Sequence, residues 1–155
     1  MTTALTIPGV EVPTWTLRRV SDPIACAFAA RHYTGDGRVR RTVGPPGRRL
    51  VLVTPCERAV WLTHWPAVGF TLDGLDAWRC SLFRNEGAGL SSSLILEAMA
   101  TTAREWGEPP SDGWLTYVDP PKLRSSNPGA CFKHAGWRLD RAYSAWNGRL
   151  LRLRA

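Results

Sequence analysis

The sequence of this 155-residue chain is poor in lysine and methionine, and it has no long hydrophobic run. It contains no stretch of 18 consecutive apolar residues, which excludes a conventional membrane-spanning helix. The first residues lack the basic start and the long apolar segment of a secretory signal peptide. We therefore expect a soluble, cytoplasmic protein that does not contact a membrane.

Metal-binding patterns are also missing from the sequence. The four cysteines include no C-x-x-C pair and the three histidines include no pair spaced by four residues, so no metal site is predicted. Each cysteine falls inside an apolar stretch, where a reduced thiol packs as a small core residue. The cysteines expected in the core are Cys26, Cys56, Cys80 and Cys131.

The residues that are abundant point to a globular domain with an anionic partner. Hydrophobic residues make up 44% of the chain, and its length fits one domain. The net charge is +7, 18 of the 20 basic residues are arginine, and eight residues are tryptophan. Guanidinium groups bind phosphates through paired hydrogen bonds and stack on rings, so this composition favours a nucleic acid as partner. A solubilising charged surface is the alternative interpretation.

The spacing of apolar residues, glycines and prolines predicts an α/β (α+β) fold with a mixed central sheet flanked by helices. Residues 1–13 are expected to be a loose lead-in, and residues 14–155 are expected to form one domain. The expected helices are 24–33, 90–106 and 128–135, and the expected strands are 15–20, 50–53, 59–62, 77–83, 114–118, 137–145 and 150–154.

A glycine-containing segment, Arg84-x-x-Gly87-x-Gly89, lies between an expected strand and the most regular helix of the chain. Glycines let the backbone approach a ligand closely, and a helix amino terminus presents unbonded N–H groups to an anion. The segment therefore predicts an anion cradle, to which the serines at 91–93 add caps or further donors. A tight turn with a capped helix is the alternative.

This segment resembles the acyl-CoA pyrophosphate loop of the GNAT family of N-acetyltransferases. The expected strand at 114–119 and the segment 127–137 also resemble that family's fifth strand and last helix. The resemblance implies a GNAT-like fold that binds acetyl-CoA or another acyl-CoA. The implied cofactor-binding residues are Arg84, Asn85, Gly87, Ala88, Gly89 and Ser91 at the pyrophosphate, and Phe132 near the pantetheine arm.

A narrower resemblance lies at 31–35, where Arg-His-Tyr-Thr-Gly is similar to the His-Tyr-Ser-Gly segment of Mom-type DNA-modification proteins. Thr34 stands where those proteins have serine. Mom-type proteins are phage-encoded members of the same fold that attach a carbamoylmethyl group to adenine and protect DNA from restriction. The resemblance implies a bacterial or phage-infected cell as the setting, and iron as a candidate metal.

Five residues are candidates for catalysis. His32 could act as a general base or an iron ligand, although a helix carboxyl terminus also favours any cationic side chain. Glu86 could take a proton from an attacking amine, or it could be an exposed turn residue. Tyr117 could protonate a leaving thiolate, or it could be a buried strand residue. The set is His32, Tyr33, Glu86, Tyr117 and Asp119.

The remaining histidines are expected to be structural: His64 as a partly exposed strand residue and His134 as a solvated one. The arginine-rich stretch 34–49 is expected to be a loop that borders the acceptor pocket in a GNAT-like fold. A flipped base could be held by Tyr33, Trp61 or Trp65. The candidate nucleic-acid-binding residues are Arg38, Arg40, Arg41, Arg48, Arg49, Lys122 and Arg124.

These features lead to one leading hypothesis and two alternatives. The leading hypothesis is an acyl-CoA-dependent transferase that modifies a base in DNA. The same fold could instead acetylate a small amine or a protein amino terminus, or it could be a non-catalytic DNA-binding module. A homodimer is compatible with each of these hypotheses.

Overall fold

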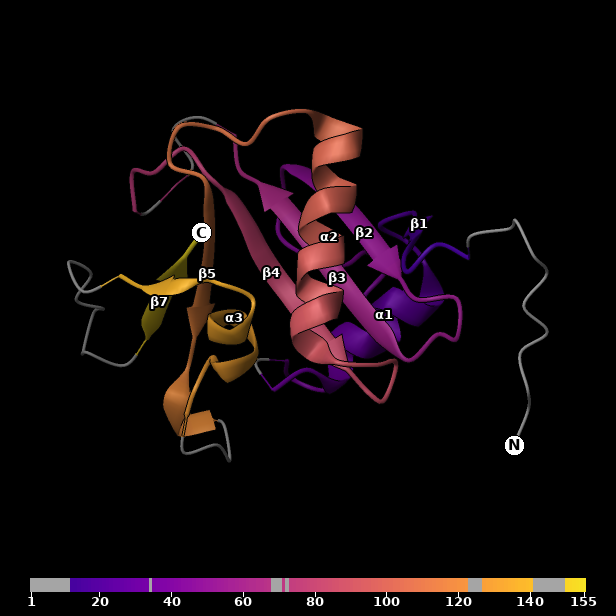
Figure 1. The fold of residues 1–155 in the computed structure, drawn as a ribbon. Coiled ribbons are helices and arrows are strands. Elements are labelled where there is room, and N and C mark those ends of the chain that lie inside the picture. The colour runs from indigo at the N-terminus through magenta and orange to yellow at the C-terminus, as the bar shows by residue number, and fades with distance from the viewer. Residues whose placement is uncertain (1–11, 34, 68–70, 72, 123–126, 141–149) are drawn as a thin grey trace.

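The computed structural model describes residues 12–33, 35–67, 71, 73–122, 127–140 and 150–155 (Figure 1). The elements follow one another in the order that the sequence predicts, with one added 3₁₀ turn. The strands are β1 (Thr16–Arg18), β2 (Arg48–Val53), β3 (Ala59–Trp65), β4 (Trp78–Asn85), β5 (Trp114–Val118), β6 (Arg138–Leu139) and β7 (Leu151–Arg154). The helices are α1 (Pro23–Arg31), α2 (Ser91–Trp106), α3 (Ala130–His134) and the 3₁₀ turn η1 (Pro120–Lys122).

The strands form one mixed sheet in the order β1-β2-β3-β4-β5-β7-β6. All neighbouring strands are antiparallel except β4 and β5, which are parallel because α2 carries the chain back between them. Strands β2 and β3 form a hairpin, with Val53 opposite Val60 beside the turn. Of the described residues, none lies in a helix that is long and apolar enough to cross a membrane.

The helices begin and end for local reasons. The side chain of Asp22 caps α1 by accepting the N–H of Ala25 at 3.0 Å, and Pro23 occupies the first turn. Helix α2 ends at Gly107, whose φ of 86° favours glycine. The prediction of a serine cap at its other end is wrong, because Leu90 is the N-cap residue and no side chain caps this helix.

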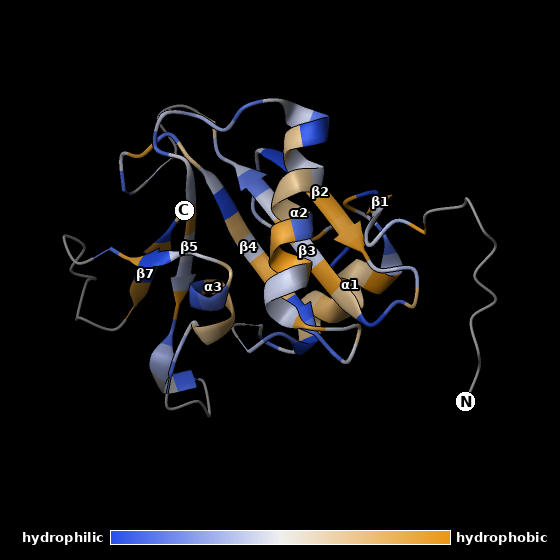
Figure 2. Ribbon diagram, viewed as in Figure 1, coloured by the Kyte–Doolittle hydropathy of each residue, from blue (hydrophilic) through white to orange (hydrophobic). Residues whose placement is uncertain are grey.

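Two separate hydrophobic clusters lie on the two faces of the sheet. The face covered by α2 and α3, called the α2 face, contains a tryptophan-rich cluster that includes Trp61, Trp78 and Trp114. The opposite face, called the α1 face, packs Phe28 of α1 against valines and leucines of β2, β3 and β4. Figure 1 shows α2 in front of the sheet and α1 behind it, and Figure 2 shows hydrophobic residues concentrated in β2, β3 and the helices over them.

One irregularity in β4 shapes the site. Leu62 pairs with Leu82 and Thr63 pairs with Cys80, so Ser81 is an extra residue that forms a β-bulge. Strand β5 pairs with β4 only from Trp78 to Cys80 and not beyond the bulge. The two parallel strands therefore separate at the bulge.

Several predictions of local structure are wrong. Arg48 and Arg49 belong to β2 and not to the preceding loop, and β4 continues through Arg84 and Asn85. Cys56 is exposed, because it lies in the hairpin turn and not in the core. Much of the expected strand 137–145 lies outside the described residues.

Two aromatic predictions also change. His64 is buried and not partly exposed, and its Nε2 lies 2.8 Å from the carbonyl oxygen of Pro46, which satisfies the ring inside the protein. Trp61 is fully buried beneath α2, so it is not placed to hold a base. Its indole N–H donates to Thr63 within the core.

Candidate functional site

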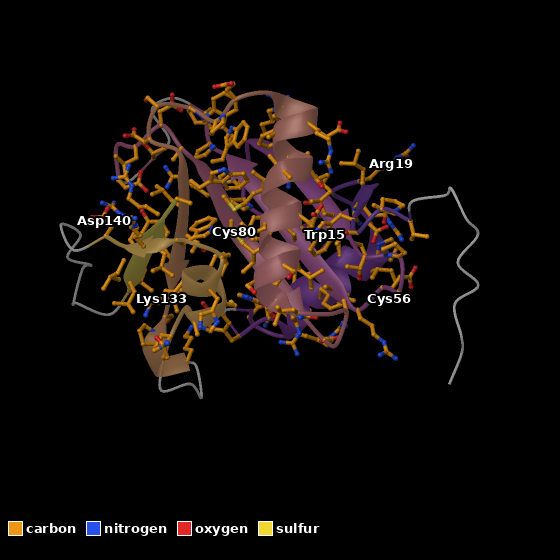
Figure 3. All side chains as sticks on the ribbon, viewed as in Figure 1. Trp15, Arg19, Cys56, Cys80, Lys133 and Asp140 are labelled. Atoms are coloured by element: carbon orange, nitrogen blue, oxygen red, sulfur yellow. The ribbon has the colours of Figure 1, made fainter. Side chains whose placement is uncertain are left out.

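A small cavity of about 50 Å³ lies where β4 and β5 separate. Cys80 and Thr116, the last residues that pair between the two strands, line it, and Figure 3 labels Cys80. Three elements or their ends, α1, β5 and α3, contribute residues that the sequence singled out. These residues are His32, Tyr33, Tyr117 and Phe132.

His32 lies at the carboxyl end of α1 with its ring against Tyr33, at a centroid distance of 4.4 Å. Burial lowers the pKa of His32 to about 4, and the positive charge of Arg84 acts in the same direction. A hydrogen bond with the backbone of Phe83 on β4 opposes this shift only in part. The imidazole is therefore uncharged near pH 7.

Tyr33 extends from the same end of α1 toward β5. Burial raises the pKa of Tyr33, while a hydrogen bond with the backbone of Asp119, just after β5, acts in the opposite direction. His32 thus contacts the backbone of one separated strand, and Tyr33 contacts the backbone beyond the other. The next residue of the predicted motif, Thr34, lies outside the described residues.

Tyr117 is fixed on the α1 face by an ionic network. Its hydroxyl donates to Oδ2 of Asp73 at 2.5 Å, and its side chain also hydrogen-bonds to Arg152. Burial raises the pKa of Tyr117, and the hydrogen bond to Asp73 raises it further. Because its proton points to Asp73, Tyr117 in this arrangement does not aim it into the cavity.

Asp73 also binds Arg79 with both carboxylate oxygens, and neither side chain is more than 12% exposed. Burial acts to raise the pKa of Asp73, but hydrogen bonds from Arg79 and Tyr117 outweigh it and hold that pKa well below its usual range. Sequence reasoning missed Asp73, which lies in a segment read only as a loop. No periodic pattern marks it.

The other predicted catalytic residue near β5, Asp119, is buried beside η1. Its Oδ2 lies 3.9 Å from Nζ of Lys122, so this lysine is partly paired. Phe132 packs between Phe83 and Trp137 and forms an apolar wall of the cavity. Arg124 lies outside the described residues.

The turn between β4 and α2 is organised by the side chain of Asn85. Its Oδ1 accepts the N–H groups of Gly87 and Ala88, and its Nδ2 donates to the carbonyl of Gly89 and the hydroxyl of Ser91. Gly87 and Gly89 have φ values of 101° and 144°, which other residues rarely adopt. The predicted cradle residues therefore do form one compact turn at the amino terminus of α2.

The two charged residues of this turn face the α1 face. Nε of Arg84 donates to Oε2 of Glu86 at 2.6 Å, and its Nη1 donates to the carbonyl of Arg31 at 3.0 Å. Glu86 also binds Arg31, and hydrogen bonds from Arg31 and then from Arg84 lower the pKa of Glu86. This carboxylate is therefore a weaker base than an unpaired one.

The predicted nucleic-acid-binding arginines do not form one track. Arg48 lies on the α2 face, with its guanidinium 4.5 Å from the ring centre of Trp106. Arg49 lies on the α1 face and donates to the carbonyl of Val43 at 3.0 Å, so it has a structural contact. Three exposed arginines remain in the loop before β2, and one of them, Arg40, pairs with Asp36. They are Arg38, Arg40 and Arg41.

No cluster of three histidine, cysteine or acidic side chains suited to a metal ion occurs within the described part of the chain. Comparison of the chain with models of known families, with curated proteins and with solved structures found no match. The geometry of the cavity, of the glycine turn and of the charged groups around them therefore carries the functional argument.

Proposed function

We propose that this protein is a GNAT-type, acyl-CoA-dependent transferase that modifies a base in DNA, in the manner of the Mom-type proteins it resembles. One observation carries this proposal. The parallel strands β4 and β5 separate after three residue pairs, and the cavity between them is lined by His32, Tyr33 and Phe132.

The separated strands offer a binding mode for the donor. Beyond Cys80 and Thr116, the facing backbone edges of β4 and β5 no longer pair with each other. Unpaired strand edges accept an extended chain that carries amide groups, as in the addition of a strand to a sheet. The pantetheine arm of CoA is such a chain. His32 and Tyr33 line this gap and bond with the backbone of Phe83 and Asp119, so their rings would lie beside the bound arm.

The turn after β4 suits the phosphate end of the same donor. Helix α2 has 16 residues and no side-chain cap, so the N–H groups of its first turn are available to an anion. Asn85 holds Gly87 and Ala88 in the turn that brings the backbone to this point. The chain residues present therefore fit an acyl-CoA.

Bound acyl-CoA would supply a thioester as acyl donor, from which CoA would leave as the thiol when the acyl group passes to an acceptor nitrogen. His32 is the residue best placed to take the proton that this nitrogen loses, since its ring lines the cavity and is uncharged near pH 7. Tyr33 and Phe132 would exclude water from the cavity. Glu86 and Tyr117 are less suited to proton transfer, because both are already bonded to charged partners.

DNA is favoured as the acceptor because exposed positive charge lies close to the cavity in the chain. The exposed arginines 38, 40 and 41 follow α1 in the chain, and α1 ends at the cavity. Neutralising phosphates with such groups releases counterions and drives binding. Tyr33 is the predicted base-holding aromatic residue that lies at the cavity.

The proposal is tested by incubating DNA with the protein and acetyl-CoA and analysing the nucleosides by mass spectrometry. We expect an acyl-modified base, and calorimetry should show CoA binding. Gly89→Val should abolish both, because the side chain strains the turn at φ 144°. Gly107→Val is the matched control, since this glycine also has a positive φ but lies at the other end of α2. An unmodified digest together with absent CoA binding would refute the proposal.

A further inference from the structure

We propose that Arg31 and Arg84, aligned by the carboxylate of Glu86, form a phosphate-binding site beside the β4–β5 cavity. The nature of the ligand rests on the proposed function, because the phosphate is assigned to the DNA acceptor. The binding site itself is argued from the contacts of these three side chains.

Glu86 holds both guanidinium groups in fixed orientations. Arg31 donates its Nε to Oε2 at 3.2 Å and its Nη2 to Oε1 at 3.0 Å, and Arg84 donates its Nε to Oε2 at 2.6 Å. The guanidinium of Arg31 also lies over the ring of Phe28, 4.6 Å from its centre. Side chains fixed in this way lose little entropy when they bind a ligand.

The cluster is left with positive charge and with donors. Two guanidinium groups share one carboxylate, so their net charge is +1. Each guanidinium has five N–H donors, of which the described contacts use two in each residue. Arg31 is 47% exposed and Arg84 is 34% exposed, so solvent and ligands reach them. Two adjacent guanidinium groups, each with N–H donors in a fixed planar arrangement (a fork), match the oxygens of a phosphate.

The cluster lies next to the reactive part of the cavity. Arg31 directly precedes His32, and the charge of Arg84 contributes to the lowered pKa of that histidine. A ligand that binds its phosphate here would place the atoms next to that phosphate at His32 and Tyr33. In DNA, the phosphate beside the target nucleotide meets this condition.

The face of the sheet on which a residue lies indicates whether it binds a phosphate of the acceptor or of the donor. Arg84 points to the α1 face, where it reaches Arg31, whereas Asn85 points to the α2 face and contacts Ser91. The donor phosphates are assigned to the amino terminus of α2. The side chains of Arg31 and Arg84 are therefore assigned to the acceptor, together with the exposed arginines that follow α1, and only the backbone of Arg84 stays with the donor pyrophosphate.

The test measures the binding of a fluorescent 12-nucleotide single-stranded DNA by anisotropy over a range of salt concentrations. Arg31→Ala and Arg84→Ala should each weaken binding about tenfold and reduce the salt slope by about 0.7, the value for one phosphate contact on a single strand. Arg104→Ala removes an exposed arginine near the far end of α2 and should change neither quantity. Arg31→Lys keeps the charge but loses the fork, and it should restore the salt slope without the full affinity.

Arg84 also bonds to the backbone of α1, so circular dichroism and thermal unfolding must show that each variant is folded. Calorimetry with CoA and with dephospho-CoA then identifies the source of the phosphate. Unchanged CoA affinity with weakened DNA binding supports the acceptor assignment. Weakened binding of CoA alone overturns that assignment and gives the site to the donor.

The inference and the proposed function can fail separately. If the wild-type protein modifies DNA but both alanine variants bind DNA as tightly as it does, the phosphate site is wrong and the function stands. Equal weakening by Arg104→Ala would also overturn the site, because only overall charge would then matter. If CoA is not bound and no base is modified, the proposed function fails whatever the DNA affinities are.

Discussion

The two faces of the sheet are held by different forces around β4 and β5. On the α2 face, Trp78 packs edge-on against Trp114 and Trp106 in a cluster with little polar content. On the α1 face, the same strands carry Arg79 and Tyr117, which meet at Asp73. The next strand, β7, extends this network through Arg152 to Asp140, which Figure 3 labels.

This difference has consequences for both stability and function. Packing of indole rings is insensitive to pH and loses stability when the volume of a ring is removed. Ion pairs depend on the protonation of each partner and leave polar atoms within reach of a ligand. The α2 face therefore holds the separated strands in place, and the α1 face supplies the groups that respond to charge.

The largest effect is expected on the α2 face. Trp78→Ala should lower the free energy of unfolding by about 4 kcal/mol, because it leaves a large cavity under α2. Urea unfolding followed by circular dichroism measures this loss. Trp106→Ala is the control, since this partly buried indole should cost less. A loss below about 2 kcal/mol for Trp78→Ala would show that the indole cluster does not dominate this face.

On the α1 face, Asp73→Ala should lower the free energy of unfolding by about 3 kcal/mol, because Arg79 and Tyr117 lose their shared partner inside the protein. Asp36→Ala breaks the exposed pair with Arg40 and should cost only about 0.3 kcal/mol. Adding Arg79→Met to Asp73→Ala should recover part of the loss. Equal effects of Asp73→Ala and Asp36→Ala would mean that burial adds nothing to the first pair.

A pH-dependent loss is expected at His32. Its pKa is about 4 in the folded protein, so between pH 7 and pH 5 the unfolded chain binds the proton more strongly. Stability should therefore fall by about 2 kcal/mol more in the wild-type protein than in His32→Gln as the pH drops across this range. Unfolding free energies measured at both pH values give this difference. Parallel pH profiles would contradict the lowered pKa.

The smallest effect separates the arginines of the two faces. Arg48→Ala removes a cation that lies over Trp106 and Trp65 and should cost about 1 kcal/mol of stability. It should leave DNA affinity unchanged, whereas Arg41→Ala should weaken binding. Thermal unfolding and anisotropy measure the two quantities. A clear loss of DNA affinity in Arg48→Ala would show that the acceptor also reaches the α2 face.

Much of the fold could be predicted because apolar spacing reports burial directly. The bounds of β5 agree with the prediction, and α2 begins within one residue of it. Glycine spacing also indicated the turn that Asn85 holds. These features depend on residues close together in the sequence, where propensity and periodicity act.

What the sequence could not reveal depends on contacts between distant segments. His64 is buried beside the carbonyl oxygen of Pro46, which accepts a hydrogen bond from its ring N–H, and no alternation pattern encodes that contact. Arg48 and Arg49 point to opposite faces of the sheet, and this follows only once both residues are placed in a strand. The role of Asp73 at Tyr117 joins positions 44 residues apart.

The bulge at Ser81 reverses which side chains of β4 point to each face of the sheet. Ahead of it, Cys80 belongs to the α2 face, and after it Leu82 belongs to the α1 face, although two residues of a regular strand would share a face. This one inserted residue directs Arg84 toward Arg31 and Asn85 toward the glycine turn. Deleting Ser81 would exchange their directions, so a single residue keeps the two proposed phosphate sites on opposite sides of the sheet.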